Sequence, residues 1–133
     1  MKKYIGTKQV EAEPMTMGDA FGKHLLREKP TVENFDDAGY HVKYSDGYES
    51  WSPAKPFEES YKYCDTFLDR LEIEQSELSD KLEKLRAFIE SPKFTDIVKD
   101  EYQRTLLLKQ ESQMHGYLET LNERIKLLKN ELH

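Results

Sequence analysis

The sequence predicts an α+β protein, in which a small N-terminal antiparallel sheet of three strands with one short helix precedes a long antiparallel two-helix hairpin. An Asp46-Gly47 turn signal separates two runs of strand-forming residues. A heptad pattern of apolar residues extends from Phe57 to Ile89, and a second apolar seam follows Pro92. We therefore expect residues 1–52 to form a β-rich module and residues 53–133 to form a helical hairpin that supports oligomerisation.

The first expected strand extends from Lys3 to Ala12, where residues with a preference for extended structure alternate loosely. Pro14 ends this strand. Thr16 is then expected to cap a short helix, which closes before Pro30.

The next two strands, Gly39–Tyr44 and Tyr48–Trp51, form the hairpin around Asp46-Gly47. A two-residue turn at Asp46-Gly47 would place Trp51 opposite Val42. Strand alternation places Tyr40, Val42 and Tyr44 on one face of the sheet, and His41 and Lys43 on the other.

A long helix is expected from Pro53 to about Glu90, with Ser52 as its N-cap. Its apolar residues recur in alternating steps of four and three, a spacing that produces a narrow seam. The seam consists of Phe57, Tyr61, Cys64, Leu68, Leu71, Gln75, Leu78, Leu82, Leu85 and Ile89. Because one helix cannot bury such a seam by itself, we expect a second helix to lie against it.

The second helix is expected to start near Thr95 or Asp100 and to continue to about Asn130. Its expected seam is Leu107, Gln110, Met114, Tyr117, Leu121, Ile125, Leu128 and Leu132. Two consecutive steps of four, from Tyr117 to Ile125, interrupt the heptad. Leu106 and Leu108 flank the seam, so more apolar surface is present than one partner helix covers. This excess predicts a homo-oligomer, a dimer or higher.

Composition excludes several classes of function. Hydrophobic residues make up 37% and charged residues 35% of the chain, which is typical of a molecule with a thin core. The net charge is −6 and neither half is basic, so duplex nucleic acid is not expected as the main ligand. Cys64 is the only cysteine, and no apolar run is long enough for a membrane helix. We expect a protein of the reducing cytoplasm that does not bind membranes.

Motifs for catalysis are absent from the sequence. The histidines are scattered and form no zinc pattern, and no P-loop, GxGxxG or Gly-x-Ser-x-Gly element occurs. Helical carboxylates at Glu72, Glu74, Glu77 and Asp80 leave open an enzyme that acts on nucleotides with magnesium, the least favoured interpretation. We expect no enzyme, no catalytic residue, no metal and no cofactor.

Aromatic and basic residues gather in the N-terminal module and suggest a nucleotide ligand. Aromatic faces stack on bases, and Lys or Arg pairs with phosphate. The candidate ligand-binding residues are Tyr40, Tyr48 and Trp51 for the base, and Lys8, Lys43 and Arg104 for the phosphate. The alternative interpretation is that Tyr44 and Trp51 are simply the core of a small sheet.

The chain also resembles known proteins. Tyr4-Ile5-Gly6-Thr7-Lys8, Pro14-Met15-Thr16 and the stretch from Gly39 to Pro53 look like an N-terminal module of small bacteriophage proteins. The helical part, with Phe94, Gln110, Met114 and Tyr117, is similar in plan to the hairpin shared by Thoeris and CBASS antagonists. This resemblance implies an oligomeric sponge that sequesters a cyclic nucleotide or cyclic ADP-ribose signal without cleaving it.

The leading hypothesis is therefore a phage anti-defence protein that captures a host immune messenger in the cytoplasm of the infected cell. The alternative is a non-enzymatic interaction module that binds a host or phage protein through its sheet or hairpin.

Overall fold

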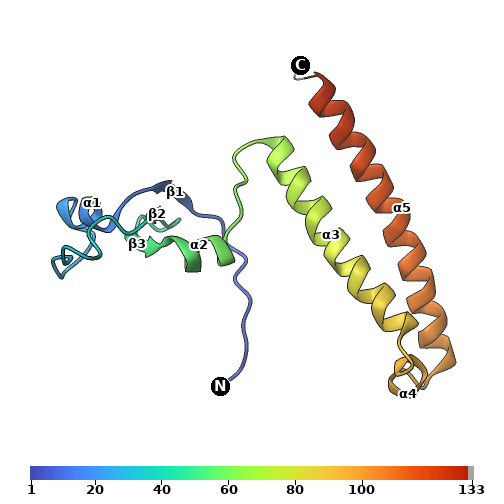
Figure 1. Cartoon of the computed structure of the whole chain (residues 1–133). Coiled ribbons are helices and arrows are strands. Elements are labelled where there is room, and N and C mark those ends of the chain that lie inside the picture. Colours follow the sequence, from blue (N-terminus) through green and yellow to red (C-terminus); the bar gives the residue numbers. More distant parts are fainter. Residues whose placement is uncertain (132–133) are drawn as a thin grey trace. The chain divides into compact units, whose positions relative to one another are not determined.

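The computed structural model describes residues 1–131 and divides into two compact units, Met1–Lys62 and Tyr63–His133 (Figure 1). The architecture is α+β. The first unit contains β1 (Glu11–Pro14), α1 (Met17–Gly22), β2 (Gly39–Lys43), β3 (Glu49–Pro53) and α2 (Ala54–Ser60). The second contains α3 (Phe67–Glu90), α4 (Phe94–Ile97) and α5 (Glu101–Glu131).

The sheet is antiparallel and three-stranded, with the order β1-β2-β3, as the sequence predicts. The first strand is shorter than expected, because it begins at Glu11 instead of Lys3. β2 offers partners only from Glu11 opposite Lys43 to Pro14 opposite Tyr40. The residues before Glu11 therefore have no strand to pair with, and their backbone groups stay solvated.

The β2–β3 turn contains one residue more than predicted. Val42 lies opposite Ser50, and Trp51 lies opposite His41 instead of Val42. The Tyr44 amide bonds the Tyr48 carbonyl at 2.8 Å, so a three-residue loop connects the strands. Gly47 has φ +90°, the left-handed conformation that such loops place at their last residue. The predicted two-residue turn is wrong because Gly47 takes this bulge position.

The first unit is held together around Trp51. Its indole Nε1 donates a hydrogen bond to the Met15 carbonyl at 2.7 Å. The ring lies over Gly39 so closely that a Cβ there would come within 2.3 Å of it. α1 begins as predicted, because the Thr16 side chain accepts a hydrogen bond from the Asp19 amide. It ends at Gly22, earlier than the sequence indicated.

The predicted continuous helix from Pro53 to Glu90 is wrong, because α2 and α3 are separate helices. Thr66 and Asp69 form a reciprocal capping box, which fixes a new helix start before Phe67. Phe57 and Tyr61, predicted as seam residues, instead belong to an aromatic stack with Tyr40 in the first unit. The ring centroids are 4.2 Å apart for Tyr40–Phe57 and 4.8 Å apart for Phe57–Tyr61.

α3 and α5 pack side by side and run in opposite directions, with α4 in the connection between them (Figure 1). Three cross-helix contacts show the antiparallel register: Glu72 with Lys129, Gln75 with Asn122, and Arg86 with Glu111. The core consists of Leu71, Leu78, Leu121 and Ile125, with Leu68, Met114, Leu118 and Leu128 packed against it. The α3 part of this core lies on the predicted seam.

The α5 seam differs from the prediction at two positions. The less exposed residues of α5 are Arg104, Leu107, Glu111, Met114, Leu118, Leu121, Ile125 and Leu128, an uninterrupted sequence of steps of three and four. Gln110 and Tyr117 are exposed, so the predicted interruption of the heptad is wrong. The error arose because no charged residue was considered for a seam position, whereas Glu111 occupies one and pairs with Arg86. Leu132 lies outside the described residues.

No helix within residues 1–131 has both the length and the hydrophobicity that crossing a lipid bilayer requires.

A groove between the two long helices as the candidate site

The aromatic residues predicted to bind a base lie on opposite faces of the sheet. Trp51 shares a face with His41 and Lys43, because it is the direct cross-strand partner of His41. Tyr40 and Tyr48 project from the other face, where Tyr48 stacks on Tyr44 with centroids 5.7 Å apart. The three rings therefore do not converge on one ligand.

Tyr40 is already engaged by its own unit. Its hydroxyl donates a 2.8 Å hydrogen bond to Glu58, and its ring stacks on Phe57. The hydrogen bond to Glu58 raises the pKa of Tyr40 above the ordinary tyrosine value, with smaller contributions from burial and from the negative charge of Glu58.

The sheet face that carries Lys43 is predominantly acidic. His41 lies 3.5 Å from Glu13 and 2.8 Å from Glu49, and a shallow depression of about 230 Å³ is lined by Glu11, Ala12, Glu13, His41, Lys43 and Glu49. Because three carboxylates surround one lysine, this face does not attract phosphate. Within the described residues no group of three or more His, Cys, Asp or Glu side chains is placed to hold a metal ion.

The two remaining predicted phosphate ligands lie elsewhere. Lys8 precedes β1 and is exposed in a segment without regular structure. Arg104 belongs to the second unit, where its Nη1 donates hydrogen bonds to the carbonyls of Val98 at 2.8 Å and Lys99 at 2.9 Å. The Arg104 guanidinium therefore satisfies the backbone carbonyl groups of the α4–α5 connection. The six predicted residues are thus distributed over two units and over both faces of the sheet.

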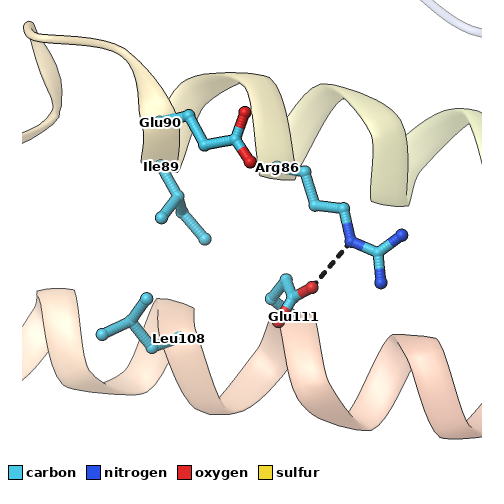
Figure 2. Close-up of a pocket in the computed structure, with 5 residues that line it drawn as sticks. All are labelled: Arg86, Ile89, Glu90, Leu108 and Glu111. Carbon is cyan, nitrogen blue, oxygen red and sulfur yellow. Dashed lines mark hydrogen bonds and ion pairs between the residues drawn. The ribbon is translucent and has the colours of Figure 1, made fainter.

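A different site appears between α3 and α5. A groove of about 210 Å³ is lined by Arg86, Ile89, Glu90, Leu108 and Glu111, which Figure 2 shows as sticks. Ile89 and Leu108 point toward one another across it and form its apolar part. The polar groups are two carboxylates and one guanidinium, which gives this small groove a formal charge of −1.

Arg86 is held by a chain of polar contacts. Its Nε donates to Glu111 Oε1 at 2.7 Å, and its Nη2 lies 2.9 Å from His115 Nδ1. Because a guanidinium only donates, His115 Nδ1 accepts, and Nε2 carries the proton toward Glu119 Oε1 at 3.0 Å. The chain fixes the orientation of Arg86 and the tautomer of His115.

This site was missed because no charged residue was considered for a seam position of the two helices. The missed signal was one charged residue on each helix. Arg86 lies beside the α3 seam and Glu111 lies within the α5 seam, and an antiparallel arrangement of the helices brings the two residues to the same level. A polar residue at a seam position of a heptad fixes the register of the two helices at a cost in stability. Such a residue therefore indicates a specific polar contact between the helices.

Comparisons with known proteins single out the same unit. Residues 65–127 match the family model described as Sequestin, just under half of the chain. No match was found among the curated proteins or among the solved structures. The matched segment starts two residues before α3 and ends within α5, so it contains the helical pair and the groove. The part of the chain that is similar to the Sequestin family is therefore the helical unit.

Proposed function

We propose that this protein is a sequestering protein of phage anti-defence that binds a host immune messenger of the cyclic nucleotide or cyclic ADP-ribose type without cleaving it. The observation that carries the proposal is the match of residues 65–127 to the Sequestin family, whose name denotes sequestration. The similarity of the helical plan to Thoeris and CBASS antagonists supplies the class of messenger.

The α3–α5 groove is the binding site that we assign to this function. It combines an apolar surface with a fixed guanidinium, the two features that a nucleotide needs for its base and its phosphate. That Lys8, Lys43, Tyr48 and Trp51 of the first unit contact the ligand stays a prediction, separate from the groove.

The size of the groove supports a site shared between subunits. Its volume of about 210 Å³ is below the roughly 300–1,000 Å³ that encloses a whole small-molecule ligand. Leu108, at its edge, is 50% exposed, and Leu106, Tyr117 and Leu127 add further exposed apolar surface on α5. A second copy that covers these residues would enlarge the groove and would contribute the positive charge that one chain lacks.

A binding role without catalysis agrees with the polar chemistry of the groove. Arg86 and Glu111 neutralise one another, and His115 is held between Arg86 and Glu119. These contacts fix the orientation of Arg86, Glu111 and His115, which suits a site that holds a ligand in place.

The test is a search for the captured molecule. The full-length protein is expressed in cells whose Thoeris or CBASS system is active, purified and denatured by heat, and the supernatant is analysed by mass spectrometry. We expect an intact cyclic messenger at a fixed ratio to protein. Titration calorimetry with cyclic dinucleotides, cyclic trinucleotides and cyclic ADP-ribose isomers then gives the dissociation constant.

The control is the Arg86→Ala variant purified from the same cells, which should release much less messenger. A supernatant free of nucleotide, together with no heat from any of these compounds, would contradict the proposal. A single stoichiometric protein partner in the same preparation would favour the protein-interaction alternative.

A further inference from the structure

The groove between α3 and α5 offers more acceptors than donors to a ligand. Arg86 Nε is used by Glu111, and one Nη2 hydrogen is directed at His115. The carboxylate of Glu90 makes no hydrogen bond or ion pair with any residue in the described range 1–131. An ionised carboxylate accepts hydrogen bonds and donates none. The groove is therefore built to receive N–H groups.

The position of these acceptors defines the shape of the ligand part that fits. In Figure 2 the Glu90 side chain extends along α3 toward Arg86, while the Glu111 carboxylate on α5 is directed at the Arg86 guanidinium, with which it forms a hydrogen bond. Ile89 and Leu108 form the apolar surface beside them. A flat heterocycle that rests on the two aliphatic side chains would bring its edge to the carboxylates.

We propose that this groove binds the amino-bearing edge of a purine base, with Glu90 and Glu111 as acceptors for its exocyclic N–H donors. This inference rests on the proposed function and specifies which part of the messenger the groove contacts. The phosphate is met at the rim of the groove by the N–H groups of Arg86 that Glu111 and His115 do not use.

The proposal predicts different affinities for purines that differ in the exocyclic amino group. Adenine and guanine carry an exocyclic amino group, whereas hypoxanthine carries none. A site built from buried or half-buried acceptors rejects the analogue that lacks the matching donor, since the acceptors then stay unpaired. Glu111 is 28% exposed at its side chain, so part of this penalty applies to it, whereas Glu90 is exposed and contributes through the hydrogen bond alone.

The experiment compares AMP, GMP and IMP, which share one phosphate and one sugar, with the full-length protein at millimolar ligand. Amide chemical shifts in ¹H–¹⁵N NMR spectra give both the affinity and the location. We expect AMP or GMP to shift the amides around Ile89 and Leu108 and to bind at least roughly fivefold tighter than IMP.

Two variants test which carboxylate is responsible for the preference for AMP or GMP over IMP. Glu90→Gln keeps the side-chain size but replaces one acceptor oxygen by an NH₂ group, and it should bring the affinities for IMP and for the better purine close to one another. Glu83→Gln is the matched control on α3, because Glu83 is exposed and does not line the groove. It should leave the preference unchanged.

Equal affinity for IMP, shifts confined to other residues, or no binding by any of the three nucleotides would overturn the purine-edge proposal. Release of an intact messenger from purified protein would in that case still support the proposed function. Absence of both the messenger and the nucleotide shifts would overturn both.

Discussion

The two units of this protein are stabilised in different ways. The helical unit repeats one type of contact along a seam from Leu68 to Ile89, opposite a seam from Arg104 to Leu128. The sheet unit depends on a few individual contacts, such as Trp51 against Gly39 and Tyr40 against Phe57. A repeated contact tolerates the loss of a member at its exposed edge, whereas an individual contact has no substitute. The sheet unit is therefore vulnerable at single residues, and the helical unit mainly at the buried centre of its seam.

The largest expected effect comes from the centre of the helical seam. Leu121 is fully buried in the cluster with Leu71, Leu78 and Ile125. Leu121→Ala should lower the free energy of unfolding by about 2–5 kcal/mol, because it removes buried methyl groups and leaves a cavity. Urea unfolding followed by circular dichroism at 222 nm measures the loss.

The control is Lys126→Ala on the same helix, where the side chain is exposed and lies outside the apolar surface proposed to be covered by a second copy. It should change the free energy of unfolding by less than about 0.5 kcal/mol. If the two variants lost equal stability, the seam would not be the main source of stability in this unit.

The contrast between repeated and individual contacts also explains which elements of the fold the sequence predicts. Period and turn signals predicted the α+β class, the three-stranded sheet and most of the α3 seam, because alternation and heptads are local patterns. The break between Ser60 and Phe67 was missed, since Phe57, Tyr61 and Cys64 continue the heptad spacing. Only the aromatic stack on Tyr40 and the capping box at Thr66 show that the pattern is not one helix.

The candidate site was predicted less well, for a related reason. Aromatic and basic residue types are recognisable in a sequence, but the face on which each lies depends on register. The single-residue shift in the β2–β3 turn moves Trp51 opposite His41 instead of Val42. The pairing of Arg86 with Glu111 spans two helices, so no local pattern contains it.

Gly39→Ala tests the individual contacts of the sheet unit. The new Cβ would lie 2.3 Å from the Trp51 ring and 2.4 Å from the Ser52 carbonyl oxygen, so the backbone or the ring must shift. We expect a loss of about 1–3 kcal/mol and a change in the emission of Trp51, the only tryptophan.

Gly6→Ala is the control, because a Cβ there meets no atom within 4 Å. It should leave both the unfolding curve and the tryptophan emission unchanged. Unchanged emission in Gly39→Ala would show that Trp51 does not pack on Gly39 in solution, and the proposed difference between the units would fail.

Thr66→Ala tests the capping box that starts α3, where the sheet unit ends and the helical unit begins. It removes the acceptor for the Asp69 amide at 3.0 Å and should cost about 0.5–2 kcal/mol. Thr120→Ala, in the middle of α5, removes only a contact to the Gly116 carbonyl and should be neutral or slightly stabilising. Equal effects of the two substitutions would indicate that the helix does not start at the capping box.

The smallest expected effect is electrostatic and lies beside the seam. The hydrogen bond of Tyr117 to Glu74 raises the pKa of Tyr117, with burial and the charge of Glu74 adding to the shift and Arg124 opposing it. A folded-state pKa above the unfolded value of 10.0 means that this contact stabilises the fold below pH 10 and is lost as the pH rises through the folded pKa. Tyr117→Phe should therefore reduce the loss of stability between neutral and strongly alkaline pH, which urea unfolding at the two pH values measures. Alkaline titration at 295 nm should show that the tyrosine lost in Tyr117→Phe titrates above the ordinary tyrosine value of 10.0. An unchanged alkaline loss of stability in Tyr117→Phe would mean that the Tyr117–Glu74 contact is absent in solution, and the flank of the seam would then depend on apolar packing alone.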